Sequence, residues 1–200
     1  MAKVRYTWSI STGAAAILVS GVANADAGVP MLFVTFPAML MALMPIIIVE
    51  TFVLGRMIRV RVLSAIKPVA IANVVSTVVG IPIAWFVLVF LELLTGGGSA
   101  YGLATPTQRF LAVTWQAPWL DPYGQDLSWM VPTASLVLLV PFFLVSYWIE
   151  ALIVSSMMKS FPEKQVRKGV FAANLSSYAL LAAFNIAWLV CWVIHPPKMA

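Results

Sequence analysis

Four long apolar segments dominate the pattern of hydrophobic and polar positions along this chain. They cover approximately residues 31–55, 68–94, 131–158 and 169–194. Each is longer than the roughly 20 residues that an α-helix needs to cross the hydrocarbon core of a bilayer. The pattern therefore predicts four membrane-spanning helices. Several of them contain proline, and we expect kinks rather than breaks there, because neighbouring helices can satisfy the freed backbone groups.

The composition places the chain in the same class. Of its 200 residues, 62% are apolar and only 10% are charged, and the mean hydropathy is +0.98. This leaves too little polar side-chain surface to cover a soluble globule. The sequence therefore predicts an all-α integral membrane protein whose immediate partner is the lipid bilayer.

The start of the chain has the features of a signal peptide. A basic beginning and a short apolar stretch precede Ala23-Asn24-Ala25, which matches the small-x-small cleavage pattern. An uncleaved first helix is the alternative, and it gives the same topology. The predicted divisions are a signal peptide (1–25), a first helical hairpin (26–94), an extracytoplasmic loop (95–130) and a second helical hairpin (131–200).

The distribution of basic residues predicts the orientation in the membrane. The net charge is +5, but the lysines and arginines form short clusters between apolar runs, so we predict no nucleic-acid partner. Of the twelve, ten fall on one side of the predicted membrane, namely Lys3, Arg5 and the eight residues of the two linkers, and only Arg109 and Lys198 fall on the other. The positive-inside rule then places both linkers in the cytoplasm, and the mature N-terminus and the C-terminus in the periplasm, of a bacterial inner membrane. The linkers contain Arg56, Arg59, Arg61 and Lys67, and Lys159, Lys164, Arg167 and Lys168.

One stretch of the chain occurs twice, over residues 45–82 and 145–182. Each copy has an apolar segment with one glutamate, a short basic linker, and a second apolar segment that opens with Ala-Asn-x-x-Ser. Both hairpins cross the membrane inward and then outward. We therefore predict two parallel repeats related by a pseudo-two-fold axis along the membrane normal. The residues in register are Glu50 with Glu150, Asn73 with Asn174, and Ser76 with Ser177.

The repeat predicts a polar cluster inside the membrane. Two antiparallel helices joined at the basic linker bring each glutamate level with its asparagine, two or three turns from the cytoplasmic surface. The asparagine and serine of each copy are spaced i,i+3 and face the same side. A charged carboxylate at the bilayer centre costs on the order of 3 kcal/mol, so it needs a proton, a partner or water. If the two halves pack face to face, Glu50, Glu150, Asn73 and Asn174 can converge.

Three interpretations of this cluster are open. In the first, the glutamates fix the register of the hairpins, and the chain is a structural or assembly subunit of a membrane complex. In the second, the cluster binds a proton, an ion or a small polar solute. Four helices make a thin pathway, so such a translocation unit predicts a homodimer or partner subunits. In the third, the chain is an intramembrane enzyme, although it contains no HExxH motif and no Ser/His/Asp set. We predict no catalytic residue, metal or cofactor.

The external loop contains its own helix signal. Thr105-Pro106-Thr107-Gln108 has a capping threonine, a proline in the first turn and a glutamine at the capping-box position. We expect a short interfacial helix to follow. The aromatic residues near it are typical of a membrane-interface belt, with a stacking platform for a ligand as the alternative. They are Trp115, Trp119, Tyr123 and Trp129.

The repeated motifs resemble those of a group of bacterial four-span membrane proteins to which no activity is assigned. The likeness lies in the block Asp26-Ala-Gly-Val-Pro-Met-Leu-Phe, in the segments ending at Glu50 and Glu150, and in the twin Ala-Asn-x-x-Ser motifs. It covers most of the mature chain. The resemblance implies a bacterial plasma or photosynthetic membrane and no particular chemistry.

Overall fold

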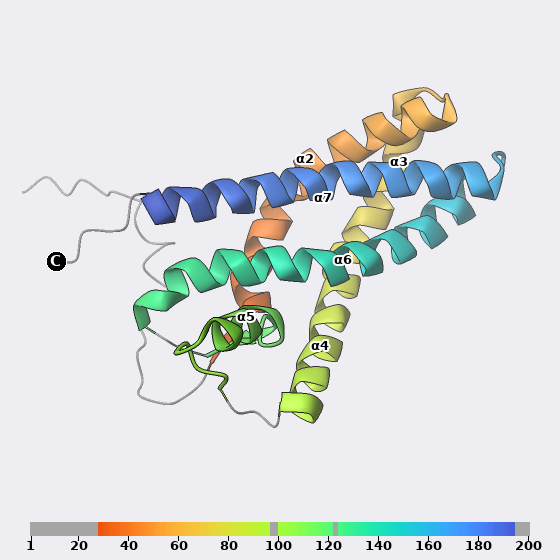
Figure 1. Ribbon diagram of the computed structural model, residues 1–200. Coiled ribbons are helices and arrows are strands. Elements are labelled where there is room, and N and C mark those ends of the chain that lie inside the picture. Colours follow the sequence, from red (N-terminus) through yellow and green to blue (C-terminus); the bar gives the residue numbers. More distant parts are fainter. Residues whose placement is uncertain (1–27, 97–99, 122–123, 195–200) are drawn as a thin grey trace, which may run out of the picture.

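The computed structural model describes residues 28–96, 100–121 and 124–194. The predicted signal peptide therefore lies outside the described residues, as does Tyr123. Within the described part of the chain, four helices are long and apolar enough to cross a membrane. The predicted helical fold with four helices of membrane-spanning length is confirmed, and Figure 1 shows the arrangement of the helices.

The first and third spans are single helices, α2 (Met31–Ile58) and α6 (Leu127–Met157). The second span consists of α3 (Val62–Val75), a π-helical turn η1 (Ser76–Gly80) and α4 (Ile81–Gly96). The fourth is α7 (Glu163–Ile194). Short loops join α2 to α3 and α6 to α7, and both loops lie at the same end of the molecule, here called the linker end (Figure 1).

Two helices begin earlier than the apolar pattern predicts. The second span starts at Val62 rather than near 68, and the fourth starts at Glu163 rather than near 169. The first addition contains Lys67, and the second contains Lys164, Arg167 and Lys168. Lysine and arginine are good helix formers, and their long side chains can extend from a helix toward water. Hydropathy alone therefore marks the apolar part of α7 and misses its basic first turns.

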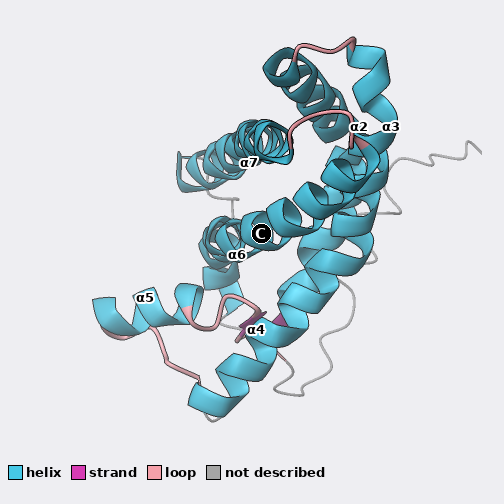
Figure 2. Cartoon of the chain, turned by 90° about the vertical axis from the view of Figure 1, so that its right-hand side faces the viewer, coloured by secondary structure: helices cyan, strands magenta, loops and turns pink. Residues whose placement is uncertain are grey.

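The helices pack in a ring at the linker end. Helix α2 contacts α3 and α7, and α6 contacts the same two helices. Small residues allow the close approaches: a Cβ atom added at Gly80 would lie 2.6 Å from Ile149 Cδ1, and one at Gly169 would lie 2.7 Å from Leu54 Cδ1. Toward the opposite end α4 diverges from α7 (Figures 1 and 2). The ring is therefore tightest near the linkers.

The helices continue through their prolines without breaking. Pro37 and Pro45 lie inside α2, and Pro132 and Pro141 lie inside α6. The π-helical turn ends two residues before Pro82, which has no N–H to offer the carbonyl four residues back. The widened turn is closed by Ile81 N–H, which donates to Ser76 O, five residues earlier. The sequence did not predict this register change.

The buried apolar residues form two separate clusters. The first, at the end opposite the linkers, is built from α2, α4, α5 and α6 around Met31, Trp85 and Phe142. The second, at the linker end, is built from α2, α3, α6 and α7 around Leu54, Val154 and Val166. The helices are thus held together by two apolar cores, one toward each end.

The segment between α4 and α6 folds against the first core. Strand β1 (Val29–Pro30) pairs antiparallel with β2 (Trp119–Leu120), and the 3₁₀ turn η2 (Gly124–Asp126) leads into α6. The pair is drawn in magenta in Figure 2. Trp85 Nε1 donates to Pro118 O at 2.8 Å, and the Trp85 and Trp119 rings stack with centroids 6.0 Å apart. Trp119 therefore packs against the protein rather than projecting freely.

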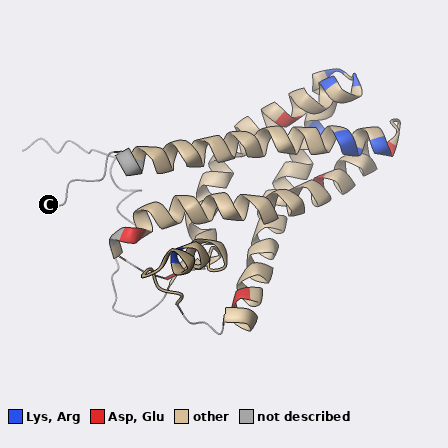
Figure 3. Cartoon of the chain, viewed as in Figure 1, with Lys and Arg blue, Asp and Glu red and all other residues tan. Residues whose placement is uncertain are grey.

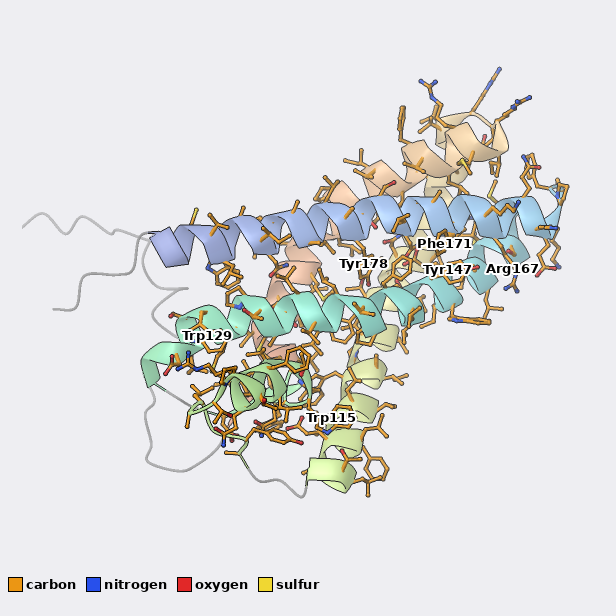
Figure 4. All side chains as sticks on the ribbon, viewed as in Figure 1. Trp115, Trp129, Tyr147, Arg167, Phe171 and Tyr178 are labelled. Carbon is orange, nitrogen blue, oxygen red and sulfur yellow. The ribbon has the colours of Figure 1, made fainter. Side chains whose placement is uncertain are left out.

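Two other external tryptophans are positioned by hydrogen bonds. Trp115 is 46% exposed, and its Nε1 donates to Thr95 Oγ1 at 2.8 Å. Trp129 Nε1 donates to Asp126 Oδ1 at 2.9 Å. Figure 4 shows Trp115 beside α4 and Trp129 at the start of α6. The two rings are apart from each other, so they do not form one platform.

The predicted capping box is confirmed at the start of α5 (Pro106–Thr114). Gln108 N donates to Thr105 Oγ1 at 3.2 Å, and Thr105 N donates to Gln108 Oε1 at 2.9 Å. Each bond gives a partner to a backbone N–H group that the start of the helix would otherwise leave unpaired.

We expect Thr105→Ala to loosen α5. Loss of a capping side chain costs about 1 kcal/mol, which raises the frayed population about fivefold. Arg109 provides a trypsin site within this helix. Trypsin cleavage after Arg109 in detergent should become about fivefold faster, since cleavage follows the open population. Thr107→Ala, which removes no capping bond, should cleave at the wild-type rate, and equal rates for the two variants would contradict the prediction.

Candidate functional site

Glu50 is buried inside the helix bundle, where it is 2% exposed. It lies eight residues before Ile58, the last residue of α2, or about 12 Å from that end of the helix. Asn73 Nδ2 donates to Glu50 Oε2 at 2.6 Å, and Ser177 Oγ donates to Glu50 Oε1 at 2.5 Å. One donor comes from the neighbouring helix of the same hairpin, and the other comes from α7 of the second hairpin.

Glu150 on α6 has a matching pair of donors. Asn174 Nδ2 donates to Glu150 Oε2 at 2.6 Å, and Ser76 Oγ donates to Glu150 Oε1 at 2.7 Å. Here the amide comes from the second hairpin and the hydroxyl from the first. Every carboxyl oxygen of the two glutamates thus accepts a hydrogen bond from a buried side chain.

The structure brings all six predicted site residues together. Each carboxyl takes its amide donor from its own hairpin and its hydroxyl donor from the other hairpin. None of the six side chains is more than 3% exposed. The sequence predicted the pairing of each glutamate with its asparagine, but it did not predict the exchange of serines. The six residues, here called the acidic cluster, are Glu50, Asn73, Ser76, Glu150, Asn174 and Ser177.

The two carboxyl groups lie close to each other. Asn174 and Ser177 are one helical turn apart on α7, and they bind Glu150 and Glu50, respectively. The two carboxyls are thereby held as neighbours inside the bundle. Ionised carboxylates only accept hydrogen bonds, so a bond between the two requires a proton on one of them. The arrangement is therefore a carboxyl pair that can hold a shared proton.

Backbone carbonyls orient the two amides. Asn73 Nδ2 also donates to Val69 O at 3.1 Å, and Asn174 Nδ2 donates to Val170 O at 3.2 Å. Both hydrogens of each amide are thus used, one on the helix and one on a carboxyl. This fixes the nitrogen, rather than the oxygen, toward the glutamate. The donors are preorganised for carboxyl oxygens.

The acidic cluster lies between the two apolar cores. On α6, Phe142 belongs to the first core and Ala151 to the second, with Glu150 between them. On α2, Glu50 lies between Met39 and Leu54 in the same way. The cluster is therefore a polar layer within an apolar bundle, where hydrogen bonds are stronger than in water.

Three polar residues near the cluster were missed by sequence reasoning. Ser146 Oγ and Tyr178 Oη lie 2.9 Å apart, joining α6 to α7. Ser146 precedes Glu150 by one helical turn, and Tyr178 follows Ser177 directly, so their positions along the chain were the available signal. Thr51, beside Glu50, is 2% exposed. Within the described residues, Thr51 Oγ1 and Asn174 Oδ1 are buried without a hydrogen-bond partner.

A cavity of about 450 Å³ reaches the cluster from the end opposite the linkers. Helices α2, α6 and α7 line it, mostly with apolar side chains. Ser177 forms part of its wall, so the cavity meets the hydroxyl that donates to Glu50. The other polar residues in the wall are Thr35, Ser135 and Asn185, each bonded to a carbonyl of its own helix.

The donor set is unsuited to a hard metal cation. Such ions bind oxygen ligands directly, whereas here N–H and O–H groups already occupy the carboxyl oxygens. Within the described residues, no group of three or more histidine, cysteine, aspartate or glutamate side chains could hold a metal ion.

The fold and the site define a multi-pass α-helical membrane protein with a buried carboxyl pair. No protein-family model, curated protein or solved structure matches the chain.

Proposed function

We propose that this chain is a proton-translocating unit of the bacterial inner membrane and that the Glu50–Glu150 carboxyl pair is its proton-binding group. The closeness of the two carboxyls, which bind Asn174 and Ser177 one turn apart on α7, carries the proposal. Two carboxyl groups held together in an apolar layer favour the state with one proton over the doubly ionised state, because like charges repel strongly there.

The surrounding donors favour a proton over a larger ligand. A solute or a cation would have to displace the amide and hydroxyl hydrogens that lie 2.5–2.7 Å from the carboxyl oxygens. A proton needs no such space. The buried Asn174 Oδ1 offers one further acceptor beside the pair, which a water molecule or a proton-bearing group can use.

Access to the pair differs at the two ends of the bundle. From the end opposite the linkers, the 450 Å³ cavity extends to Ser177. Toward the linkers, the second apolar core closes the bundle with residues such as Leu54, Val154 and Val170. In this proposal the structure is one of two states, and proton release to the linker side requires the second core to loosen.

The two hairpins are proposed to be parallel repeats about a pseudo-two-fold axis along the membrane normal. The crossed hydrogen bonds support this, since each hairpin gives the other a serine and keeps its own asparagine. The basic residues gather at the linker end, with Arg109 at the opposite end (Figure 3). This distribution supports cytoplasmic linkers and periplasmic termini. A homodimer or partner subunits would widen the thin pathway.

One observation favours a second candidate function, that of a structural or assembly subunit. All four carboxyl oxygens already have donors, so the cluster is complete as a cross-link between the hairpins. In that role the pair would hold the two halves in register and would exchange no proton during function.

A flux assay with purified chain in proteoliposomes tests the proposal. A pH-sensitive dye inside the vesicles and an imposed potassium diffusion potential report proton entry. We expect wild-type flux well above that of protein-free vesicles, and a loss of at least tenfold in the Glu50→Gln/Glu150→Gln variant. Glutamine keeps the shape of the protonated carboxyl and cannot release a proton.

Glu92→Gln is the matched control, because Glu92 lies on α4 outside the acidic cluster. Its flux should equal that of the wild type. Flux in the Glu50→Gln/Glu150→Gln variant equal to the wild type would overturn the proposal, as would wild-type flux no higher than in empty vesicles. A folded double variant that no longer co-purifies with membrane partners would instead support the assembly role.

A further inference from the structure

A second hollow lies at the linker end of the molecule, between α6 and α7. Its volume is about 610 Å³, and it is open to the outside of the bundle. It does not include any residue of the acidic cluster. Its lining residues are Tyr147, Glu163, Lys164, Arg167, Lys168 and Phe171.

One face of α7 supplies most of this lining. Lys164, Arg167, Lys168 and Phe171 follow the spacing i, i+3, i+4, i+7, so their side chains lie along one stripe of the helix. The stripe is basic at the N-terminal end of α7, where Lys164 lies, and aromatic about two turns further along, at Phe171. Seven residues of α-helix span about 10 Å, which is more than the thickness of one lipid headgroup layer.

The charges in the hollow do not cancel. Arg167 Nε donates to Glu163 Oε1 at 2.8 Å, which neutralises one cation and holds its guanidinium over the hollow. Lys164 and Lys168 form no ion pair within the part of the chain that the structure describes. Two ammonium groups are therefore available to an anion.

Aromatic rings form the inner part of the hollow. The Tyr147 and Phe171 rings meet edge to face, with centroids 5.5 Å apart and planes at 88°. Figure 4 shows Tyr147, Phe171 and Arg167 together along the facing sides of α6 and α7. Phe171 is 44% exposed although it is apolar. An exposed ring next to cationic groups at a membrane surface fits a ligand with an anionic end and an apolar end.

We propose that this hollow is a binding site for the headgroup of an anionic phospholipid in the leaflet at the linker end. The phosphodiester lies between Lys164 and Lys168, and the first part of the acyl chains lies against Tyr147 and Phe171. Basic pockets between membrane helices bind anionic headgroups in this way, at about 1 kcal/mol for each basic residue near the surface. The site is independent of the proton-translocation proposal.

Binding is tested with delipidated full-length chain in neutral detergent, by thermal unfolding and by native mass spectrometry. Phosphatidylglycerol should raise the unfolding midpoint and give a bound-lipid peak, while zwitterionic phosphatidylcholine should do neither. Lys164→Gln/Lys168→Gln should reduce both signals by more than half. If this variant does not fold, Lys168→Gln alone, at an exposed position, serves the same comparison.

The other basic linker provides the matched control. Arg61→Gln/Lys67→Gln removes the same charge at exposed positions outside the hollow, and its response to phosphatidylglycerol should equal that of the wild type. A loss in this control as large as in Lys164→Gln/Lys168→Gln would overturn the proposal in favour of diffuse electrostatic attraction. In a last set of measurements, glycerol phosphate and inorganic phosphate replace the lipid. Equal stabilisation by either would overturn the lipid assignment and indicate a soluble phosphate ligand.

Discussion

Asn174→Ala is expected to lower the free energy of unfolding by about 2 kcal/mol, because it leaves a buried carboxyl oxygen without its donor. Asn174 is fully buried, and its Nδ2 donates to Glu150 Oε2 at 2.6 Å. The unpaired Glu150 oxygen would then face apolar side chains of the second core.

Asn185→Ala is the matched control on the same helix. Asn185 Nδ2 donates to Leu181 O at 2.9 Å, within α7, and the residue does not contact a carboxyl of the acidic cluster. Its removal should change stability by no more than about 0.5 kcal/mol, since an alanine favours the helix and the carbonyl keeps its main-chain partner. Unfolding in mixed micelles of rising denaturing-detergent fraction measures both variants. Equal losses would show that Asn174 acts as an ordinary helix residue.

The sequence predicted the part of the acidic cluster that depends on local geometry. Within one hairpin, the helical rise and the short linker determine which residues lie level, and the pairing of Glu50 with Asn73 follows from these alone. The same holds for Glu150 and Asn174. The four long helices could also be predicted from the sequence, because the length and hydropathy of a segment identify a membrane-spanning helix without knowledge of its neighbours.

Contacts between the hairpins depend on features that hydropathy does not encode. Whether Ser76 meets Glu50 or Glu150 depends on how the two hairpins pack against each other, since Ser177 makes the same exchange from the uninterrupted helix α7. Similarly, Trp119 was predicted at the membrane interface, but the pairing of β2 with β1 draws its ring against Trp85. In both cases the contact joins residues that are far apart in the sequence: Ser76 with Glu150, and Trp119 with Trp85.

The crossed serines therefore offer the sharpest test of how the two hairpins are joined. Ser76→Ala/Ser177→Ala removes one donor from each carboxyl and should lower the free energy of unfolding by about 2 kcal/mol, at about 1 kcal/mol for each bond. The control is Ser176→Ala/Ser156→Ala. The hydroxyls of Ser176 and Ser156 donate only to carbonyls of their own helices, at 2.9 Å and 2.7 Å.

A double-mutant cycle then shows whether Ser177 acts through its carboxyl partner. In the Glu50→Gln background, the acceptor for the Ser177 hydroxyl is altered, so Ser177→Ala should cost clearly less than in the wild type. The same substitution in a Glu150→Gln background should keep its full cost, because Ser177 does not donate to Glu150. Equal costs in all three backgrounds would mean that Ser177 does not act through the Glu50 carboxyl and that this bond does not join the two hairpins.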